Sequence, residues 1–110
     1  MGMDTQNCAL DRVHLAQQTM GDAGLEKQVL TIFVDHMAET MPRLTPATEE
    51  VCQIAHSIKG SARGIGAWDV AAAAEAVEKA SGDRSGEISS LKRAVDTALL
   101  EIVALLERDV

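Results

Sequence analysis

The chain has 110 residues, of which 46% are hydrophobic, and it carries a formal net charge of −7 at neutral pH. This length and apolar content predict a single domain, and because Phe33 and Trp68 are the only aromatic residues, its core must be aliphatic. The negative charge argues against a protein that binds nucleic acid, because contact with phosphate backbones needs dense Lys and Arg.

Hydrophobic periodicity places the first helices after a polar start at residues 1–8, which we expect to be flexible. Apolar spacing over residues 9–20 predicts a short helix that covers one end of a bundle, with Ala9, Val13, Ala16 and Met20 as its apolar positions. Residues 25–44 show the clearest helical period, and Pro42 is expected to kink or end that helix near Met41. Its apolar band comprises Leu30, Phe33, Val34, Met37, Met41 and Leu44.

The next helix is predicted from its boundary signals. Thr45 and Pro46 have the pattern of an N-cap followed by proline at the first helical position, so the central helix is predicted over residues 46–63. Gly64 and Gly66 are expected to end it, one of them in the left-handed conformation that caps many helices.

Two more helices complete the predicted fold. Residues 68–80 and 87–108 repeat apolar residues at helical spacing, and the segment 81–86 between them is rich in turn-forming residues. Short links between long helices favour antiparallel neighbours. The sequence therefore predicts an all-α protein, an antiparallel up-down four-helix bundle with a short extra N-terminal helix, in one domain over residues 9–110.

The central helix carries the most informative polar residues. At about 100° per residue, His56, Lys59, Gly60 and Arg63 fall on one face. Apolar residues gather on the opposite face, at Val51, Ile54, Ala55, Ile58, Ala62 and Ile65. We therefore expect the His56 imidazole to face water or a partner protein while the isoleucines face the core.

This polar face has the composition of a reversible phosphoryl acceptor. An exposed imidazole is mostly neutral near pH 7 and keeps a lone pair that can attack phosphorus. Lys59 is expected to stabilise the phosphoryl oxygens, and Arg63 either to do the same or to dock an acidic partner. Glycine in an exposed helix costs about 1 kcal/mol relative to alanine, so Gly60 predicts a need for clearance, where the rim of a partner's active site reaches His56.

The segment that begins at His56 resembles the signature of the histidine-containing phosphotransfer (Hpt) domain family, approximately H-x-[LI]-K-G-[SA]-[AS]-x-x-[LIV]-G-[AL]. The matching residues are His56, Ile58, Lys59, Gly60, Ser61, Ala62, Ile65, Gly66 and Ala67. Residues of the flanking helices also fit the family, namely Phe33, Val70, Ala74, Val77 and Glu78. The resemblance covers roughly residues 10–106.

The resemblance implies a four-helix bundle that works in a phosphorelay. His56 would accept a phosphoryl group from a receiver-domain aspartate, through a ring nitrogen expected to be Nε2, and a second receiver aspartate would accept it in turn. The expected partners are receiver domains of response regulators or hybrid histidine kinases, which supply magnesium, so the chain is expected to need no cofactor of its own. It is also expected to be a monomer. The sequence has no Gly-rich phosphate loop, and we expect a phosphoryl carrier rather than an enzyme.

Three other functions stay open at this point. One is an Hpt domain that a linked kinase phosphorylates directly, and another is a helical adaptor that binds a partner without chemistry. The third is a metal-dependent enzyme built on a helical bundle, which the lack of a Glu-x-x-His pair disfavours.

The remaining polar and exposed residues favour structural roles. His14 and His36 form no pair at ligand spacing with another His or Cys, so no metal site is predicted, and His36 is expected on a solvated face. Ile32 lies off the apolar band and is expected either to pack under the first helix or to join an exposed docking patch. Trp68 is expected to plug the end of the bundle, and Ser61 to pack, to hydrogen-bond within its own helix or to contact the site.

Cysteine usage and hydropathy favour a cytoplasmic location. Cys8 and Cys52 are too few and too far apart for a zinc signature, and we expect reduced thiols, with Cys52 packed or idle. No run approaches the ~18 apolar residues of a membrane span, and no charged and apolar stretch precedes a cleavage site, so neither a membrane span nor a leader is expected.

Overall fold

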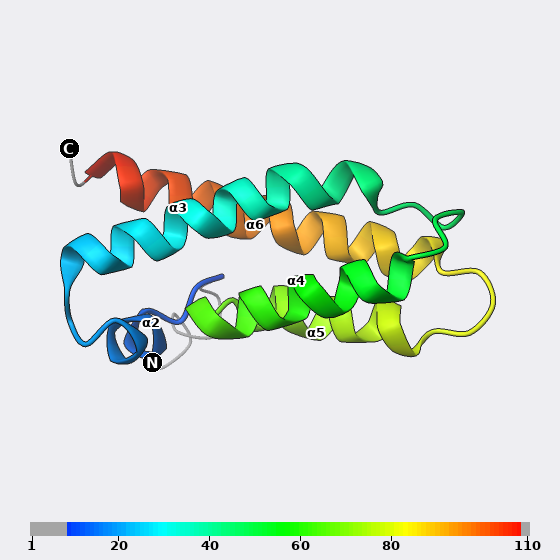
Figure 1. Cartoon of the computed structure of the whole chain (residues 1–110), viewed down its shortest axis with the longest axis horizontal. Helices are drawn as coiled ribbons and strands as arrows, with labels where there is room; N and C mark the ends of the chain where they lie inside the picture. The colour runs from blue at the N-terminus through cyan, green and yellow to red at the C-terminus, as the bar shows by residue number, and fades with distance from the viewer. Residues whose placement is uncertain (1–8, 109–110) are drawn as a thin grey trace, which may run out of the picture.

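The computed structural model describes residues 9–108, which form five α-helices and one short 3-10 helix and contain no strand. Four long helices form a bundle in which each helix reverses the direction of the one before it (Figure 1). They are α3 (Ala23–Thr40), α4 (Val51–Ile65), α5 (Trp68–Lys79) and α6 (Ser85–Arg108). The predicted all-α four-helix bundle is confirmed, and the flexibility expected for residues 1–8 lies outside the described part of the chain.

The core is aliphatic, as the composition predicted. Phe33 is its only buried aromatic side chain among residues 9–108. The bulkiest fully buried side chains come from most of the elements and the segments beside them, and include Leu10, Leu15, Met37, Leu44, Ile58, Leu91 and Ile102. All six apolar residues on the predicted core face of α4 are buried, so the polar face of this helix is turned outward.

The short helix α2 (Arg12–Gln18) lies across the end of the bundle at which α4 ends (Figure 1). It buries Leu15, whereas Val13 and Met20, two of its predicted apolar positions, are 69% and 86% exposed. The prediction was wrong here because the N–H of Asp11 donates to the carbonyl oxygen of Gly66 at 2.8 Å and the Asp11 side chain caps α2. These contacts fix both the start of α2 and the side that faces the bundle.

Proline ends α3, as expected. The 3-10 helix η1 (Met41–Arg43) follows α3 directly and contains Pro42, which cannot continue the α-helical hydrogen bonds. The apolar band of the preceding helix is largely confirmed, because Leu30, Phe33 and Met37 are buried.

The central helix begins later than predicted, at Val51 rather than at Pro46. The hydroxyl of Thr45 lies 2.8 Å from that of Thr48, and Thr48 donates a second hydrogen bond to the carbonyl oxygen of Arg43, also at 2.8 Å. Such side-chain contacts offer the chain an alternative to helix. The segment before Val51 therefore forms turns.

The other end of α4 is set by Gly66, whose φ of 82° lies in the left-handed region. Its N–H donates to the carbonyl oxygens of Ala62 and Arg63, which closes the helix. A Cβ at this position would lie 2.8 Å from the backbone oxygen of Asp11, so glycine is required twice over. Gly64 was expected to help to end the helix but lies within it, because α4 continues to Ile65.

The last two helices agree closely with the predictions. Helix α5 buries Val70, Ala74 and Val77, and α6 begins two residues earlier than expected, at Ser85. Among residues 9–108, no helix combines the length and the apolar character that crossing a membrane would need.

Candidate functional site

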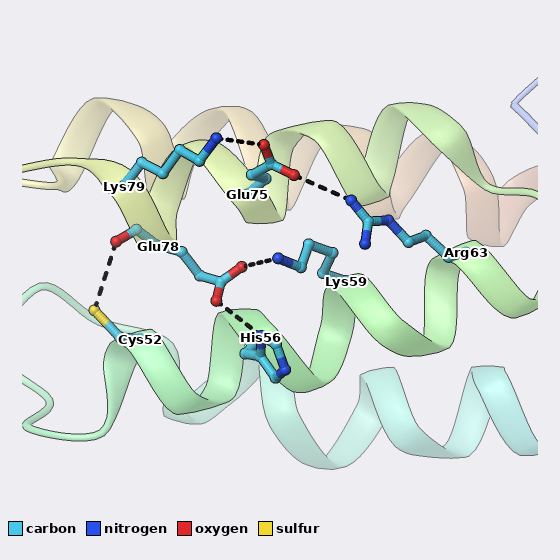
Figure 2. A network of polar contacts seen from close by, with 7 residues as sticks. All are labelled: Cys52, His56, Lys59, Arg63, Glu75, Glu78 and Lys79. Carbon is cyan, nitrogen blue, oxygen red and sulfur yellow. Dashed lines mark hydrogen bonds and ion pairs between the residues drawn. The ribbon is translucent and has the colours of Figure 1, made fainter.

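His56 projects from the outer face of α4 (Figure 2). Its side chain is 71% exposed, whereas Ile54 and Ile58 on the other side of the helix are buried. The outward orientation predicted from the spacing is confirmed, and the ring is accessible to a partner.

One nitrogen of this ring is held by a carboxylate from the neighbouring helix. The Nδ1 atom of His56 lies 2.9 Å from Oε2 of Glu78 in α5 (Figure 2). A carboxylate only accepts hydrogen bonds, so Nδ1 carries the proton and donates. In the neutral ring Nε2 therefore keeps the lone pair and is the nitrogen that is free to react.

Glu78 stays ionised because Lys59 lies against its other oxygen. Lys59 Nζ is 2.6 Å from Glu78 Oε1, an ion pair without hydrogen-bond alignment. This ammonium is the main reason that the pKa of Glu78 lies below its ordinary value; desolvation opposes the effect, and the contact with His56 adds to it. The side chain of Lys59 is only 15% exposed. The ammonium predicted to serve the phosphoryl group is thus held by Glu78.

Arg63, the other predicted phosphate ligand, is held by a second carboxylate of α5. Its Nη2 donates to Oε1 of Glu75 at 3.1 Å, and Nζ of Lys79 lies 2.7 Å from Oε2 of the same carboxylate (Figure 2). The contact with Lys79 is the main cause of the lowered pKa of Glu75, and the same contact raises the pKa of Lys79. All the cations beside His56 in α4 are therefore paired with carboxylates of α5.

The opposite flank of His56 is uncharged and hollow. Beyond the adjoining backbone of α4, a Cβ added to Gly60 or Gly64 would meet no heavy atom within 4 Å, so packing against other elements does not explain either glycine. These glycines lie along a groove of about 370 Å³ between α4 and α3, where Ile32 and Phe33 contribute the apolar wall. Ile32 is 65% exposed, which supports the docking patch rather than packing under α2.

His36 also lines this groove, and it is half-buried rather than fully solvated as expected. Its Nδ1 lies 2.9 Å from the hydroxyl of Ser61, and its Nε2 lies 3.1 Å from the hydroxyl of Ser57. The imidazole of α3 therefore faces α4, and the expectation of a solvated face was wrong. Ser61 contacts this neighbouring helix near the site, which was one of its expected roles.

Comparisons with known proteins agree with this geometry. Residues 28–109 match the Hpt domain family. The chain belongs to this family. The crystal structure of the histidine phosphotransferase ShpA from Caulobacter crescentus is similar, with 29% sequence identity, a TM-score of 0.81 and coverage of 93% of this chain and 94% of that one. No curated protein matches the sequence.

Membership gives the chain a general role. Hpt domains are phosphoryl carriers of two-component phosphorelays rather than kinases, and they interact with receiver domains. The resemblance found in the signature that begins at His56 is confirmed over most of the chain.

In this Hpt domain, the ends of α2, α4 and α5 are joined by side-chain contacts. Trp68 Nε1 donates to Oδ2 of Asp11 at 2.9 Å, which is the main cause of the lowered pKa of Asp11. The Trp68 ring lies 4.8 Å from the ring of His14, whose Nε2 is 2.9 Å from the carbonyl oxygen of Arg63. Trp68 was expected to plug the bundle end, but it is 45% exposed and ties α2 to α5.

Cys52, one turn before His56, is half-buried, and its Sγ lies 3.9 Å from the carbonyl oxygen of Glu78. It is a packed thiol, one of the roles expected for it, whereas Cys8 lies outside the described residues. No three His, Cys, Asp or Glu side chains gather into a possible metal site within residues 9–108.

Proposed function

We propose that this Hpt domain accepts a phosphoryl group from a receiver-domain aspartate on Nε2 of His56 and passes it to the aspartate of a second receiver. The observation that carries the proposal is the 2.9 Å contact between Nδ1 of His56 and Glu78. It leaves Nε2 with the lone pair in a ring that is 71% exposed.

The transfer needs few groups of this chain. The Nε2 lone pair attacks phosphorus, the N–P bond forms, and the bond from phosphorus to the aspartate oxygen breaks, with its electron pair returning to that carboxylate. The ring becomes cationic as the bond forms, and the anionic Glu78 stabilises this charge through the Nδ1–H bond. Attack by the second receiver's aspartate reverses these changes.

Lys59 is expected to assist without leaving Glu78. An ammonium has three donors, and the contact with Glu78 uses one side of Lys59, so a phosphoryl oxygen can bind to another. We expect the receiver to supply magnesium and the catalytic electrostatics, so that this domain is a carrier and no enzyme, and requires no cofactor of its own.

The uncharged groove beside His56 is the proposed docking surface. With Gly60 and Gly64, a receiver can approach the backbone of α4, and Ile32 offers an exposed apolar contact on α3. We expect this domain to act as a monomer. Receiver domains of response regulators or hybrid histidine kinases are the expected occupants.

The test is transfer of label from receiver domains phosphorylated with radiolabelled acetyl phosphate. We expect acid-labile, base-stable label on the wild type, loss of that label in His56→Gln, and retention in His14→Gln, which changes a histidine at the end of the bundle. Label on His56→Gln would refute the assignment.

The same assay separates the other functions. An adaptor would bind receivers without acquiring label. A domain served directly by a kinase would acquire label from ATP and a histidine kinase core that lacks a receiver, and would acquire none from phosphorylated receivers.

A further inference from the structure

Glu75 holds two cations with its two oxygens. Nη2 of Arg63, a residue of α4, lies 3.1 Å from Oε1, and Nζ of Lys79, a residue of α5 like Glu75 itself, lies 2.7 Å from Oε2. The Arg63 side chain is 54% exposed, so its pairing with Glu75 is weak and open to competition from another anion.

Arg63 lies on the same side of α4 as His56. Two turns of helix separate them, about 10.5 Å along the axis, with an angular offset of only about 20°. Side chains of a helix lean toward its N-terminus, and in Figure 2 the Arg63 side chain leans back along α4 toward Lys59 and His56. A rotation about the side-chain bonds of Arg63 would therefore move its guanidinium from Glu75 toward the imidazole.

We propose that Glu75 is a positioning residue that holds the Arg63 guanidinium away from His56 until a phosphoryl group on Nε2 competes for it. This inference rests on the proposed function, because it concerns the state in which His56 carries the phosphoryl group. Arg63 then exchanges one anion for another, and no covalent bond changes in this step.

Lys79 lowers the free-energy cost of moving Arg63 away from Glu75. When Arg63 leaves, Glu75 keeps its contact with Lys79 and is not left as an unpaired charge. The phosphoryl group offers Arg63 oxygens that match the planar guanidinium better than a shared carboxylate does. Competition from Glu75 therefore determines how strongly Arg63 stabilises phosphohistidine.

The experiment is a double-mutant cycle on the equilibrium ratio of phosphohistidine to phosphoaspartate, measured with one receiver domain phosphorylated by radiolabelled acetyl phosphate. This ratio compares free species, so the tightness of docking does not affect it. We expect Glu75→Gln to raise the ratio about twofold to fivefold and Arg63→Gln to lower it by a similar factor. In the Arg63→Gln background, Glu75→Gln should have little effect.

Asp69→Asn is the matched control, because it removes an exposed carboxylate from the same helix. It should leave the ratio close to that of the wild type. If Glu75→Gln raised the ratio equally in the wild-type and Arg63→Gln backgrounds, the change would be an effect of net charge and the inference would be overturned. The inference would also be overturned if Glu75→Gln did not raise the ratio.

The charge-swapped variant R63E/E75R gives a second readout. It restores an ion pair between the same two positions but also places a guanidinium beside Lys79, so stability to urea should lie between that of Arg63→Gln and that of the wild type. The phosphohistidine ratio should stay low, because a carboxylate now stands on α4; recovery of the ratio would mean that the pair is merely structural. Absence of label from wild-type His56 would instead refute the proposed function, a result distinct from label with unchanged ratios.

Discussion

Glu78 is the residue whose replacement tests the site most directly. Glu78→Ala removes the acceptor of the Nδ1 proton of His56 and the partner of Lys59 together. Glu78→Gln keeps an oxygen that can accept from Nδ1 but removes the negative charge. Comparing the two variants separates orientation of the ring from stabilisation of its charge.

The structure sets the size of each effect. The side chains of Lys59 and Glu78 are 15% and 21% exposed, so the burial of this ion pair is intermediate. A surface ion pair contributes about 0.2–1 kcal/mol to stability, and breaking a buried pair costs about 3–5 kcal/mol. We therefore expect Glu78→Ala to lower the free energy of unfolding by about 1–3 kcal/mol. A charge-assisted hydrogen bond contributes about 1.5–3 kcal/mol and less where water reaches it, so the transfer rate should fall about tenfold.

Glu78→Gln should lower the rate about threefold, because a neutral hydrogen bond is about half as strong as a charged one. The assay is the initial rate of label transfer from a phosphorylated receiver to His56, at a temperature where urea denaturation shows both variants to be folded. Nitrogen-15 NMR of the ring reports the tautomer directly, and in Glu78→Ala the proton should shift in part to Nε2.

Two results would contradict this reasoning. One is a folded Glu78→Ala protein that transfers label at the wild-type rate. The other is a ring that keeps its proton on Nδ1 in Glu78→Ala, since some other group would then set the tautomer.

Three further predictions concern stability and docking. Gly66→Ala should lower the free energy of unfolding by more than about 2 kcal/mol, because φ is 82° and the added Cβ would meet a backbone oxygen at 2.8 Å. Gly64→Ala, in open space within a helix, should raise the free energy of unfolding by up to about 1 kcal/mol. Urea titrations measure both changes. Folding lowers the pKa of Glu78, so the contribution of this carboxylate to stability is present above pH 4.5, its ordinary pKa, and is lost as the pH falls through the lower pKa of the folded state. Glu78→Gln should therefore lose less stability than the wild type in urea titrations below pH 4.5. Ile32→Lys should weaken receiver binding about tenfold, measured by calorimetry, and leave stability unchanged. The control Leu100→Lys, at a position 76% exposed on α6, should bind receivers like the wild type. An equal loss of affinity in both variants would place the docking surface elsewhere.

Local patterns in the sequence were sufficient for the helices and for the orientation of His56. Hydrophobic residues at helical spacing set which face of α4 is buried, and the imidazole lies on the opposite face. Gly60 was predicted to open the surface beside it, and the structure places no heavy atom where its Cβ would be.

Tertiary packing decided the partners of those residues. Glu78 is 22 positions from His56, and it was noticed only because it fits the following helix of the family. Its contact depends on how α5 packs along α4, which spacing within one helix does not report. The same holds for His36, which hydrogen-bonds to serines of α4 instead of facing water.

The helical period of this sequence, by itself, determined that His56 lies outside the bundle on a face with Lys59, Gly60 and Arg63. Only the packed structure decided that Glu78 accepts the hydrogen bond of Nδ1–H and pairs with Lys59, and that Glu75 pairs with Arg63. The physical reason is that a helix sets the angles between its own residues through its backbone geometry, whereas contacts between helices follow from how their side chains pack together.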